Sequence, residues 1–514
     1  MKESRCVLRI DDIEDLGLAR QVAQLLEKEN ARLHARLESV LRENASLRGE
    51  EGQKQLELEL LRLQEQMKAL QQRAFGASSE RRARDAGDGE KQKPTPPEGV
   101  REQKSLALEE NTHELSADER LCKKCGKPLA ECTGKTEDHE EVDVIERRFV
   151  LKKHKRKIYG CECGSETVAP GPLRLPGGGR YSIDFAIEVA FEKWCAHSPL
   201  ERQVRIMLGQ GLDISSNTLW EQTERLARVL LPTHLLLREY VVSSCLVHAD
   251  ETPWYMLNKG RSKWWVWSIS RHDAVFYRVD PSRAHNVIVE MLDGFDGALV
   301  SDGYSAYGAA LKALGARGIT ITLSDCWSHA RRGFVEAEAS YPECAEAVRL
   351  IGELFLIERE LPDWEIIEDP VLRAAQLDHI REIRAARSAP IVDELRIWAN
   401  AQRALPQGKL GEALTYLQNQ WDGLKVFLED PRVPLSNNHA ERSLRGVVVG
   451  RKNHYGSKSK RGTEVAAVFY SLLESANMVG VDPKAYLRAA VAAALKGRTP
   501  LLPRAYKASL AAHA

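Results

Sequence analysis

The sequence predicts a multidomain α/β protein, and three observations lead to that prediction. In the middle of the chain, apolar runs that end in aspartate alternate with helical segments. Near the N-terminus leucines recur at heptad spacing, and two close pairs of cysteines follow a polar stretch. A chain of 514 residues is long for a single core, so we expect about three or four domains.

The bulk composition limits the class of protein. Lys+Arg and Asp+Glu are both 74, so any basic surface that meets nucleic acid must be local. No apolar run reaches the roughly 18 residues of a membrane span, and the charged start of the chain does not resemble a signal peptide. We therefore expect a soluble, cytoplasmic protein with no membrane partner. Ten cysteines, four of them in close pairs, favour metal binding over disulfides in a reducing compartment.

Residues 1–74 are predicted to form a coiled coil. Positions 26, 33, 40 and 47 are Leu, Leu, Val and Leu, which is the seven-residue spacing of a leucine zipper. We expect a homo-oligomer that associates through this zipper. The alternative is a long amphipathic helix that packs on its own protein.

A polar linker at residues 75–115 leads to a predicted zinc-binding module at 116–169. The linker has too few apolar residues to bury a core. Two Cys-Gly knuckles flank a segment rich in β-branched residues, which is the pattern of a zinc ribbon with four thiolates around one structural Zn²⁺. The candidate ligands are Cys122, Cys125, Cys161 and Cys163, with Cys132, His139 and His154 as reserves because the second pair is spaced C-x-C. Simple buried thiols are the alternative.

Between the knuckles lies the densest basic run of the chain. Seven of the eleven residues from Arg147 to Lys157 are Arg or Lys. Beside a zinc module, such a run is typical of contact with the DNA backbone. The candidate residues are Arg147, Arg148, Lys152, Lys153, Lys155, Arg156 and Lys157. A solvated strand face is the alternative interpretation.

Residues 180–240 are helical by period. Within them, two helical patterns flank a glycine turn, and Ser215 or Ser216 would cap the second. This outline fits a DNA-binding helix-turn-helix, and it equally fits plain helical packing against the next domain.

The order of elements in residues 241–475 predicts a ribonuclease-H-like catalytic domain. Strand patterns cover Cys245–Asp250, Lys263–Ser270 and Ala274–Val279, a helix covers Arg283–Leu292, a fourth strand ends at Asp302, and a helix at Tyr304–Leu314 precedes a strand at Ile319–Leu323. Three meandering strands followed by strand-helix alternation is the order of that fold. A helical insertion occupies about 330–430, and residues 476–514 form a C-terminal helix and tail.

Three carboxylates are the candidate catalytic residues of this domain. Asp250 follows an apolar run and precedes an expected Thr-Pro turn, Asp302 closes a second apolar run, and Glu441 lies near the start of a helix. An acidic residue at the edge of a core is costly unless a partner or a metal meets it. Two strand-end aspartates and a helix glutamate suit a site for two divalent cations.

Each carboxylate also has an ordinary structural interpretation. Glu441 could cap the helix with Asn438, Asp302 could be a turn aspartate before a glycine, and Asp325 is a rival for the second position. Glu251 follows Asp250 directly, so it points to the opposite face of the strand and should support the site from outside.

Basic residues surround the third carboxylate. The candidates for DNA contact are Arg442, Arg445, Arg451 and Lys452, together with His329 and Arg331 after Trp327. The last two could contact phosphate or simply pack.

Taken together, these motifs resemble the insertion-sequence-66 family of bacterial transposases, which belong to the DDE class. The resemblance covers nearly the whole chain. It rests on the leucine zipper with F-G-x-x-S-E, the C-x-x-C-G module, D-E-T-P at Asp250, S-D-G-Y ending at Tyr304, C-W-x-H-x-R-R at Cys326, N-N-x-A-E-R ending at Arg442, and G-R-K-N at Gly450. The second zinc knuckle departs from the usual spacing.

The resemblance implies that Asp250, Asp302 and Glu441 hold two Mg²⁺ ions, or Mn²⁺, and catalyse 3′-end cleavage and strand transfer on double-stranded DNA. It also implies action at the bacterial nucleoid, on transposon ends and target, with accessory proteins of the same element as candidate partners. The alternative from another class is a non-catalytic, zinc-dependent DNA-binding protein that keeps a degenerate nuclease domain as a scaffold.

Overall fold

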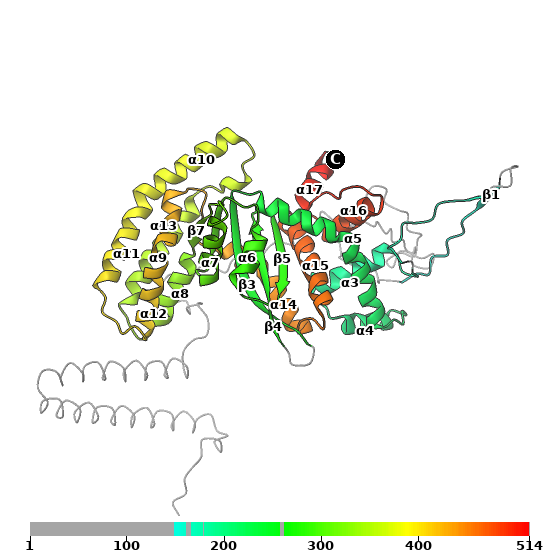
Figure 1. Cartoon of the computed structure of the whole chain (residues 1–514), viewed down its shortest axis with the longest axis horizontal. Helices are drawn as coiled ribbons and strands as arrows, with labels where there is room; N and C mark the ends of the chain where they lie inside the picture. The colour runs from blue at the N-terminus through cyan, green and yellow to red at the C-terminus, as the bar shows by residue number, and fades with distance from the viewer. Residues whose placement is uncertain (1–148, 161–165, 178, 258–261, 513–514) are drawn as a thin grey trace, which may run out of the picture. The chain divides into compact units, whose positions relative to one another are not determined.

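The computed structural model describes residues 149–160, 166–177, 179–257 and 262–512. The predicted zipper, the linker, Arg147, Arg148 and all four candidate zinc cysteines lie outside the described residues. The described part is a mixed α/β structure in which helices surround a five-stranded sheet (Figure 1). None of its helices is both long enough and apolar enough to cross a membrane.

The chain enters this part through a small antiparallel sheet and three helices. The small sheet pairs β1 (Ile158–Gly160) with β2 (Glu166–Val168), and the helices are α3 (Ile183–Trp194), α4 (Leu200–Gly209) and α5 (Ser216–Val242). Ser215 caps α5 because its side chain accepts from the backbone N–H of Thr218. Both α3 and α4 contact α5, so the predicted helical pair packs on its own protein.

The five-stranded sheet has the order β5-β4-β3-β6-β7. Its strands are β3 (Leu246–Tyr255), β4 (Lys263–Arg271), β5 (Ala274–Asp280), β6 (Ala298–Ser301) and β7 (Thr322–Asp325). The first three are antiparallel neighbours, whereas β6 runs parallel to both β3 and β7. The helices α6 (His285–Met291) and α7 (Ser305–Gly315) make the parallel crossovers.

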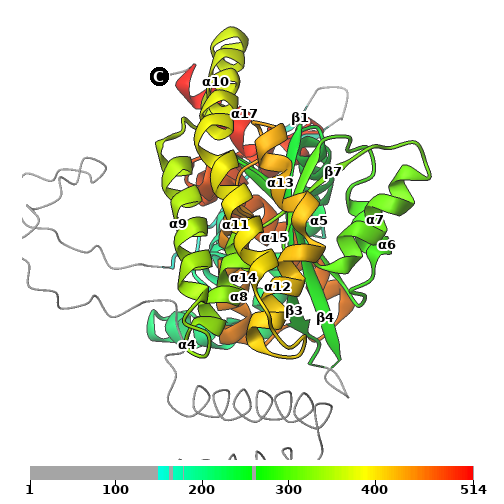
Figure 2. The ribbon, with the colours of Figure 1, turned by 90° about the vertical axis from the view of Figure 1, so that its left-hand side faces the viewer.

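The two faces of the sheet have different covers. Side chains alternate between the faces of a strand, and Val247 and Leu299 belong to the core that includes residues of α6 and α7. Leu246 and Val300, on the other face, belong to a second core formed with the helices that follow β7. Figure 2 shows α6 and α7 on one side of the strands and these later helices on the other.

The second core is an almost wholly helical region between β7 and Asn438. It contains α8 (Trp327–Glu338), α9 (Cys344–Glu360), α10 (Pro370–Ile383), α11 (Ala389–Ala401), α12 (Lys409–Asn419) and α13 (Trp421–Glu429), with a 3₁₀ turn at Trp364–Ile366 and a π-helical turn at Arg384–Ser388. The Trp327 indole donates a hydrogen bond of 2.8 Å to the carbonyl of Leu424. This contact attaches the end of the region to its beginning.

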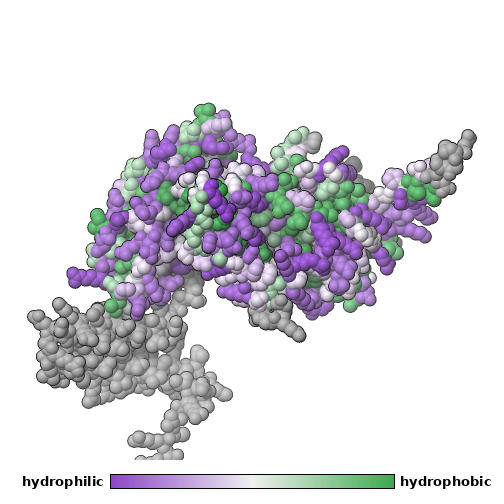
Figure 3. Space-filling view, viewed as in Figure 1, coloured by the Kyte–Doolittle hydropathy of each residue, from purple (hydrophilic) through white to green (hydrophobic). Residues whose placement is uncertain are grey.

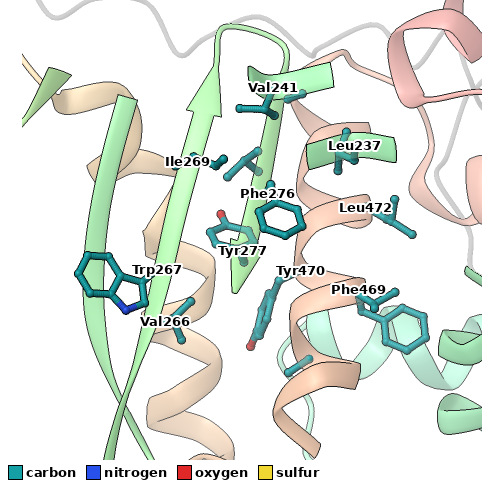
Figure 4. Packing of buried hydrophobic residues seen from close by; sticks show 14 of the residues in the cluster. Leu237, Val241, Val266, Trp267, Ile269, Phe276, Tyr277, Phe469, Tyr470 and Leu472 are labelled. Atoms are coloured by element: carbon teal, nitrogen blue, oxygen red, sulfur yellow. The ribbon is translucent and has the colours of Figure 1, made fainter. Parts of the chain in front are cut away.

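Four helices complete the described part: α14 (Asn438–His454), α15 (Lys460–Met478), α16 (Pro483–Leu495) and α17 (Pro503–Ala511). The α15 helix covers the outer edge of β5, where the hydroxyls of Ser471 and Ser475 accept from the backbone N–H groups of Tyr277 and Val275. Figure 4 shows apolar residues of the same helix beside β5. The sheet edge is thereby satisfied without another strand.

The surface of this part is mostly hydrophilic, as expected of a chain in which 29% of residues are charged. Figure 3 shows hydrophobic residues gathered near α5 and α16. Leu231, Leu235 and Leu501 are among the large apolar residues that remain exposed.

Three expectations about element boundaries are corrected by the structure. No turn follows Asp250, because β3 continues through Pro253 to Tyr255. β3 pairs with β6 only over Leu246–His248, so beyond His248 one edge of β3 has no neighbouring strand. A proline, which has no N–H to donate, is tolerated there. The last predicted strand begins later, at Thr322. The predicted C-terminal helix and tail at 476–514 contain the end of α15 and two further helices, α16 and α17, and Gly480, whose φ is +70°, lies between α15 and α16.

Candidate active site

The first carboxylate, Asp250, lies on β3 just beyond the point where the parallel neighbour β6 stops pairing. It is on the same face as Leu246 and His248, the face covered by the later helices. The backbone N–H of Glu251 donates to its Oδ1 at 2.7 Å. Burial, reinforced by Asp302 and Glu251 and more weakly by Glu441, raises the pKa of Asp250 to about 8.

The second carboxylate, Asp302, directly follows β6. Its Oδ1 accepts from the backbone N–H of Tyr304 at 3.0 Å, so it does serve as a turn aspartate before Gly303, whose φ is +81°. Within the described residues no hydrogen bond engages its Oδ2. The turn therefore orients the carboxylate and leaves its second oxygen available beside Asp250.

The insertion holds the Asp302 loop in place. The Tyr416 hydroxyl on α12 donates to the Asp302 carbonyl at 2.8 Å, and Gln420 donates to the Gly303 carbonyl at 3.3 Å. A Cβ at Gly303 would lie 3.1 Å from both side chains, so the close approach itself favours glycine.

The third carboxylate, Glu441, lies in the first turn of α14 and faces His329 of α8. His329 Nε2 is 3.7 Å from Glu441 Oε1, and that oxygen is buried without a hydrogen-bond partner. The capping alternative receives no support, since the Asn438 side chain contacts Ser328 and α14 has no side-chain cap. Within the described residues, Glu441 makes no ion pair with Arg445.

Asn437 attaches the start of α14 to β3. Asn437 is at the N-cap position of α14 but makes no capping hydrogen bond, because its side chain is fully buried and donates to the Ala249 carbonyl at 2.8 Å. The Asn437 Oδ1 lies 3.1 Å from His248 Nδ1. Since the Asn437 amide nitrogen donates to Ala249, this oxygen accepts the hydrogen bond from the His248 ring. This role of Asn437 was not predicted from the sequence, where the N-N-x-A-E-R motif contributed to the family resemblance.

Asp325, the rival for the second position, lies at the end of β7 opposite Ser301. It is 3% exposed, and its Oδ1 has no hydrogen-bond partner. Burial, followed by the nearby Asp302, raises the pKa of Asp325 to about 7. A Cβ at Gly423 would lie 2.0 Å from Asp325 Oδ2, so α13 packs directly against the Asp325 carboxylate.

Glu251 points to the opposite face, as predicted. Arg283 donates to its Oε1 at 2.6 Å, and the Tyr307 hydroxyl donates to its Oε2 at 2.8 Å. Both carboxylate oxygens are therefore already occupied by protein donors, and Glu251 fixes α7 and the segment before α6 to β3.

The candidate DNA-contact residues divide into two groups. Lys152, Lys153, Lys155, Arg156 and Lys157 are exposed just before β1, where Arg156 also donates to the Ala169 carbonyl at 2.6 Å, and Arg442, Arg445 and Lys452 are exposed on α14. Arg451 is instead engaged, because its guanidinium donates to Thr252 Oγ1 at 3.1 Å and to the Pro253 carbonyl. His329 and Arg331 are partly buried on α8, and Arg331 has an interaction within the protein.

Comparison with known proteins shows the family of the chain. The family model described as Transposase IS66 family matches residues 178–465. The uncharacterized protein y4jD of Sinorhizobium fredii is 29% identical over 406 residues, which cover 75% of this chain and 77% of the relative. The uncharacterized protein y4qI of the same organism is 28% identical over 529 residues, which cover 94% of each chain.

The fold is that of a mixed α/β protein in which helices cover a five-stranded mixed sheet. The family match is more specific and covers more than half of the sequence. The chain belongs to the IS66 family of transposases. Its activity is accordingly that of a transposase, a nuclease and transferase that acts on DNA.

Proposed function

We propose that the chain is a DDE transposase that catalyses metal-dependent 3′-end cleavage and strand transfer, with Asp250, Asp302 and Glu441 as its catalytic carboxylates. The observation that carries the proposal is their convergence. Three acidic residues from distant segments lie close enough that Asp302 and Glu441 both raise the pKa of Asp250. A domain that served only as a scaffold would gain no stability from holding three acidic residues close together.

The sheet topology supports a ribonuclease-H-like catalytic domain. Three antiparallel strands followed by two parallel ones, in the order β5-β4-β3-β6-β7, match the order expected from the sequence. In that fold the first carboxylate lies on the first strand and the second after the fourth, where Asp250 and Asp302 occur. We propose the domain at 241–475, with the helices α8 to α13 as an insertion between the second and third carboxylates.

The residues fit divalent cations. Carboxylate oxygens are the ligands that Mg²⁺ prefers, and the buried, unpartnered Glu441 Oε1 is costly without a positive charge nearby. Asp250, Asp302 and Glu441 would hold two Mg²⁺ ions, for which Mn²⁺ would substitute. When bound, such ions activate the attacking oxygen and stabilise the leaving oxygen of an in-line displacement.

The protein itself contributes positioning and charge. The Asx turn orients Asp302, and Asn437 fixes the start of α14 against β3, which brings Glu441 within electrostatic reach of Asp250. Water is the first nucleophile in the proposed reaction, and the freed 3′-hydroxyl of the element is the second. Exposed Arg442, Arg445 and Lys452 on α14 would bind phosphates beside the carboxylates.

The remaining modules complete the proposal. We assign residues 1–74 to self-association through the zipper, 75–115 to a linker and 116–169 to a zinc module with a basic run for DNA. Residues 180–240 contact DNA or brace the catalytic domain, and 476–514 form the C-terminal end. Accessory proteins of the same element are possible partners in the active complex.

Strand cleavage tests the proposal. Purified protein is incubated with a labelled duplex that carries the element's end, in Mg²⁺ or in EDTA, alongside Asp302→Asn. Metal-dependent nicking at the element's end that is lost in the variant is the expected result. The exposed Asp296 provides a matched control, since Asp296→Asn should cleave like the parent. DNA binding without cleavage, even with accessory proteins added, would favour a non-catalytic DNA-binding protein instead.

A further inference from the structure

A second group of potential ligands adjoins the three carboxylates. Cys326, His329 and Glu441 bring one sulfur, one nitrogen and one oxygen atom within 4.8 Å of one another. Cys326 immediately precedes α8 and His329 lies in its first turn, three positions later, so their side chains lie on the same side of the helix start. Glu441 comes from the first turn of α14.

The backbone holds the two helix starts together. The N–H of Asn437, at the start of α14, donates to Cys326 Sγ at 3.1 Å, and the N–H of Trp327 donates to the Leu435 carbonyl at 3.1 Å. A thiolate at this position would therefore keep a hydrogen-bond donor, as sulfur ligands of bound metals commonly do. The ligand group is built from rigid elements on both sides.

Two of the three side chains contain buried polar atoms that lack a partner. Glu441 Oε1, the oxygen that faces His329 Nε2, makes no hydrogen bond within the described residues although it is buried. His329 Nδ1 is also buried and unpartnered, but it is the other nitrogen of the ring and does not count toward the site. Metal–ligand distances of about 2.0 to 2.3 Å place tetrahedral zinc ligands roughly 3.3 to 3.8 Å apart. The separation of 3.7 Å between His329 Nε2 and Glu441 Oε1 falls in this range.

We propose that Cys326, His329 and Glu441 form a second binding site, for a thiophilic divalent cation such as Zn²⁺, that shares Glu441 with the catalytic carboxylates. Sulfur and imidazole favour Zn²⁺ over Mg²⁺, whereas carboxylates accept both. The site keeps a fourth position open, and binding displaces the Cys326 thiol proton into solution. Glu441 cannot serve both sites in the same way, so zinc bound here competes with the catalytic use of Glu441. This last consequence rests on the proposed function.

Cobalt binding tests the site without any activity measurement. Metal-free full-length protein is titrated with Co²⁺, and the sulfur-to-cobalt absorption in the near ultraviolet is followed in the parent and in Cys326→Ser. All variants keep the cysteines at 122, 125, 161 and 163. Any absorption from Co²⁺ bound to these cysteines is therefore the same in the parent and the variants, and it cancels when their spectra are subtracted. We expect Cys326→Ser to lose part of the absorption and one bound Co²⁺ per chain. Exposed Cys245 supplies the control, Cys245→Ser, which should match the parent.

His329→Gln provides a second variant that leaves the buried sulfur in place. It should weaken Co²⁺ binding at this site at least tenfold, with an unchanged circular-dichroism spectrum. Superimposable titrations of the parent, Cys326→Ser and His329→Gln would overturn the proposal.

Zinc inhibition supplies the link to cleavage. The ratio of Mg²⁺-dependent cleavage with and without Zn²⁺ is compared within each variant, so that differences in basal activity cancel. Zn²⁺ at ten times its Kd should reduce cleavage by the parent about tenfold by mass action, and it should affect Cys326→Ser much less. If Co²⁺ binding differs between the parent and the variants but no protein cleaves DNA, the metal site stands and the proposed catalytic function is refuted. If the parent cleaves DNA but Co²⁺ binding is the same in all variants, the catalytic function stands and the metal site is refuted.

Discussion

The Asn437 side chain donates a hydrogen bond of 2.8 Å to the carbonyl of Ala249, the residue directly before Asp250. The two residues are 188 positions apart in the chain. This single contact fixes the helix that carries Glu441 to the strand that carries Asp250. It explains how a third carboxylate that follows a long helical insertion reaches the first.

Replacing Asn437 with alanine should therefore damage stability and activity together. The change leaves the Ala249 carbonyl and the His248 ring buried without their partners, which costs about 1–3 kcal/mol. Urea unfolding measures the stability, and cleavage of the element's end should fall more than tenfold under conditions where the variant remains folded. The neighbouring Asn438→Ala is the control, because Asn438 is exposed and should change stability by less than about 0.5 kcal/mol. Equal effects of the two variants would show that the contact does not position Glu441.

The two aspartates after β6 and β7 should differ in their importance. Asp302→Asn should abolish cleavage, whereas Asp325→Asn should retain it within about threefold. The pKa of Asp325 is raised to about 7, so a neutral isostere resembles a state that it already populates near neutral pH. Cleavage that survives Asp302→Asn and disappears in Asp325→Asn would instead identify Asp325 as the second metal ligand.

The pKa of Asp250 predicts how stability depends on pH. The folded-state pKa of about 8 exceeds the ordinary aspartate pKa of 3.8, so between these two pH values the folded chain retains a proton that the unfolded chain has released. Stability in EDTA should therefore fall as pH rises from about 4 to about 8 and then level off. Asp325 contributes in the same direction up to about pH 7. Urea unfolding between about pH 5 and pH 9 measures the slope, which should be shallower in Asp250→Asn.

Magnesium should oppose that loss of stability. A cation that binds only the folded chain stabilises it by about 2.7 kcal/mol at a hundred times its Kd. Because the ion competes with the Asp250 proton, the stabilisation should be larger at about pH 8 than at about pH 6. Thermal unfolding with Mg²⁺ or EDTA tests this, and Asp302→Asn should lose most of the shift. A Mg²⁺ effect that is independent of pH and of Asp302 would place the ion elsewhere.

The pair formed by Glu251 and Arg283 should matter for folding and not for metal binding. The Glu251 side chain is 1% exposed, so Arg283→Met would leave a buried charge without its cation, at a cost of about 3 kcal/mol. Glu251→Gln should preserve the Mg²⁺-dependent thermal shift, because both oxygens of the Glu251 carboxylate already accept hydrogen bonds from Arg283 and Tyr307. Loss of that shift in Glu251→Gln would make Glu251 part of the metal site.

The order of strands and helices in the catalytic region was predictable from local pattern. Apolar runs of five to eight residues, glycine turns and helical periods act over short distances, and they placed β4, β5, α6 and α7 within a few residues of their positions. Boundaries that depend on neighbours were less accurate. The strand β3 passes through Pro253 because one of its sides has no strand neighbour there, which no local rule predicts.

The sequence by itself determined the acidic residues, the helical region between them and membership in a transposase family, because motifs and periodicity are properties of the chain. Only the tertiary structure decided which functional groups meet. Glu441 faces His329 and Cys326, Asn437 bonds to β3 in place of capping its helix, and Arg451 turns toward Pro253. Such contacts join residues about a hundred or more positions apart, and they depend on how packed helices and strands bury their polar groups.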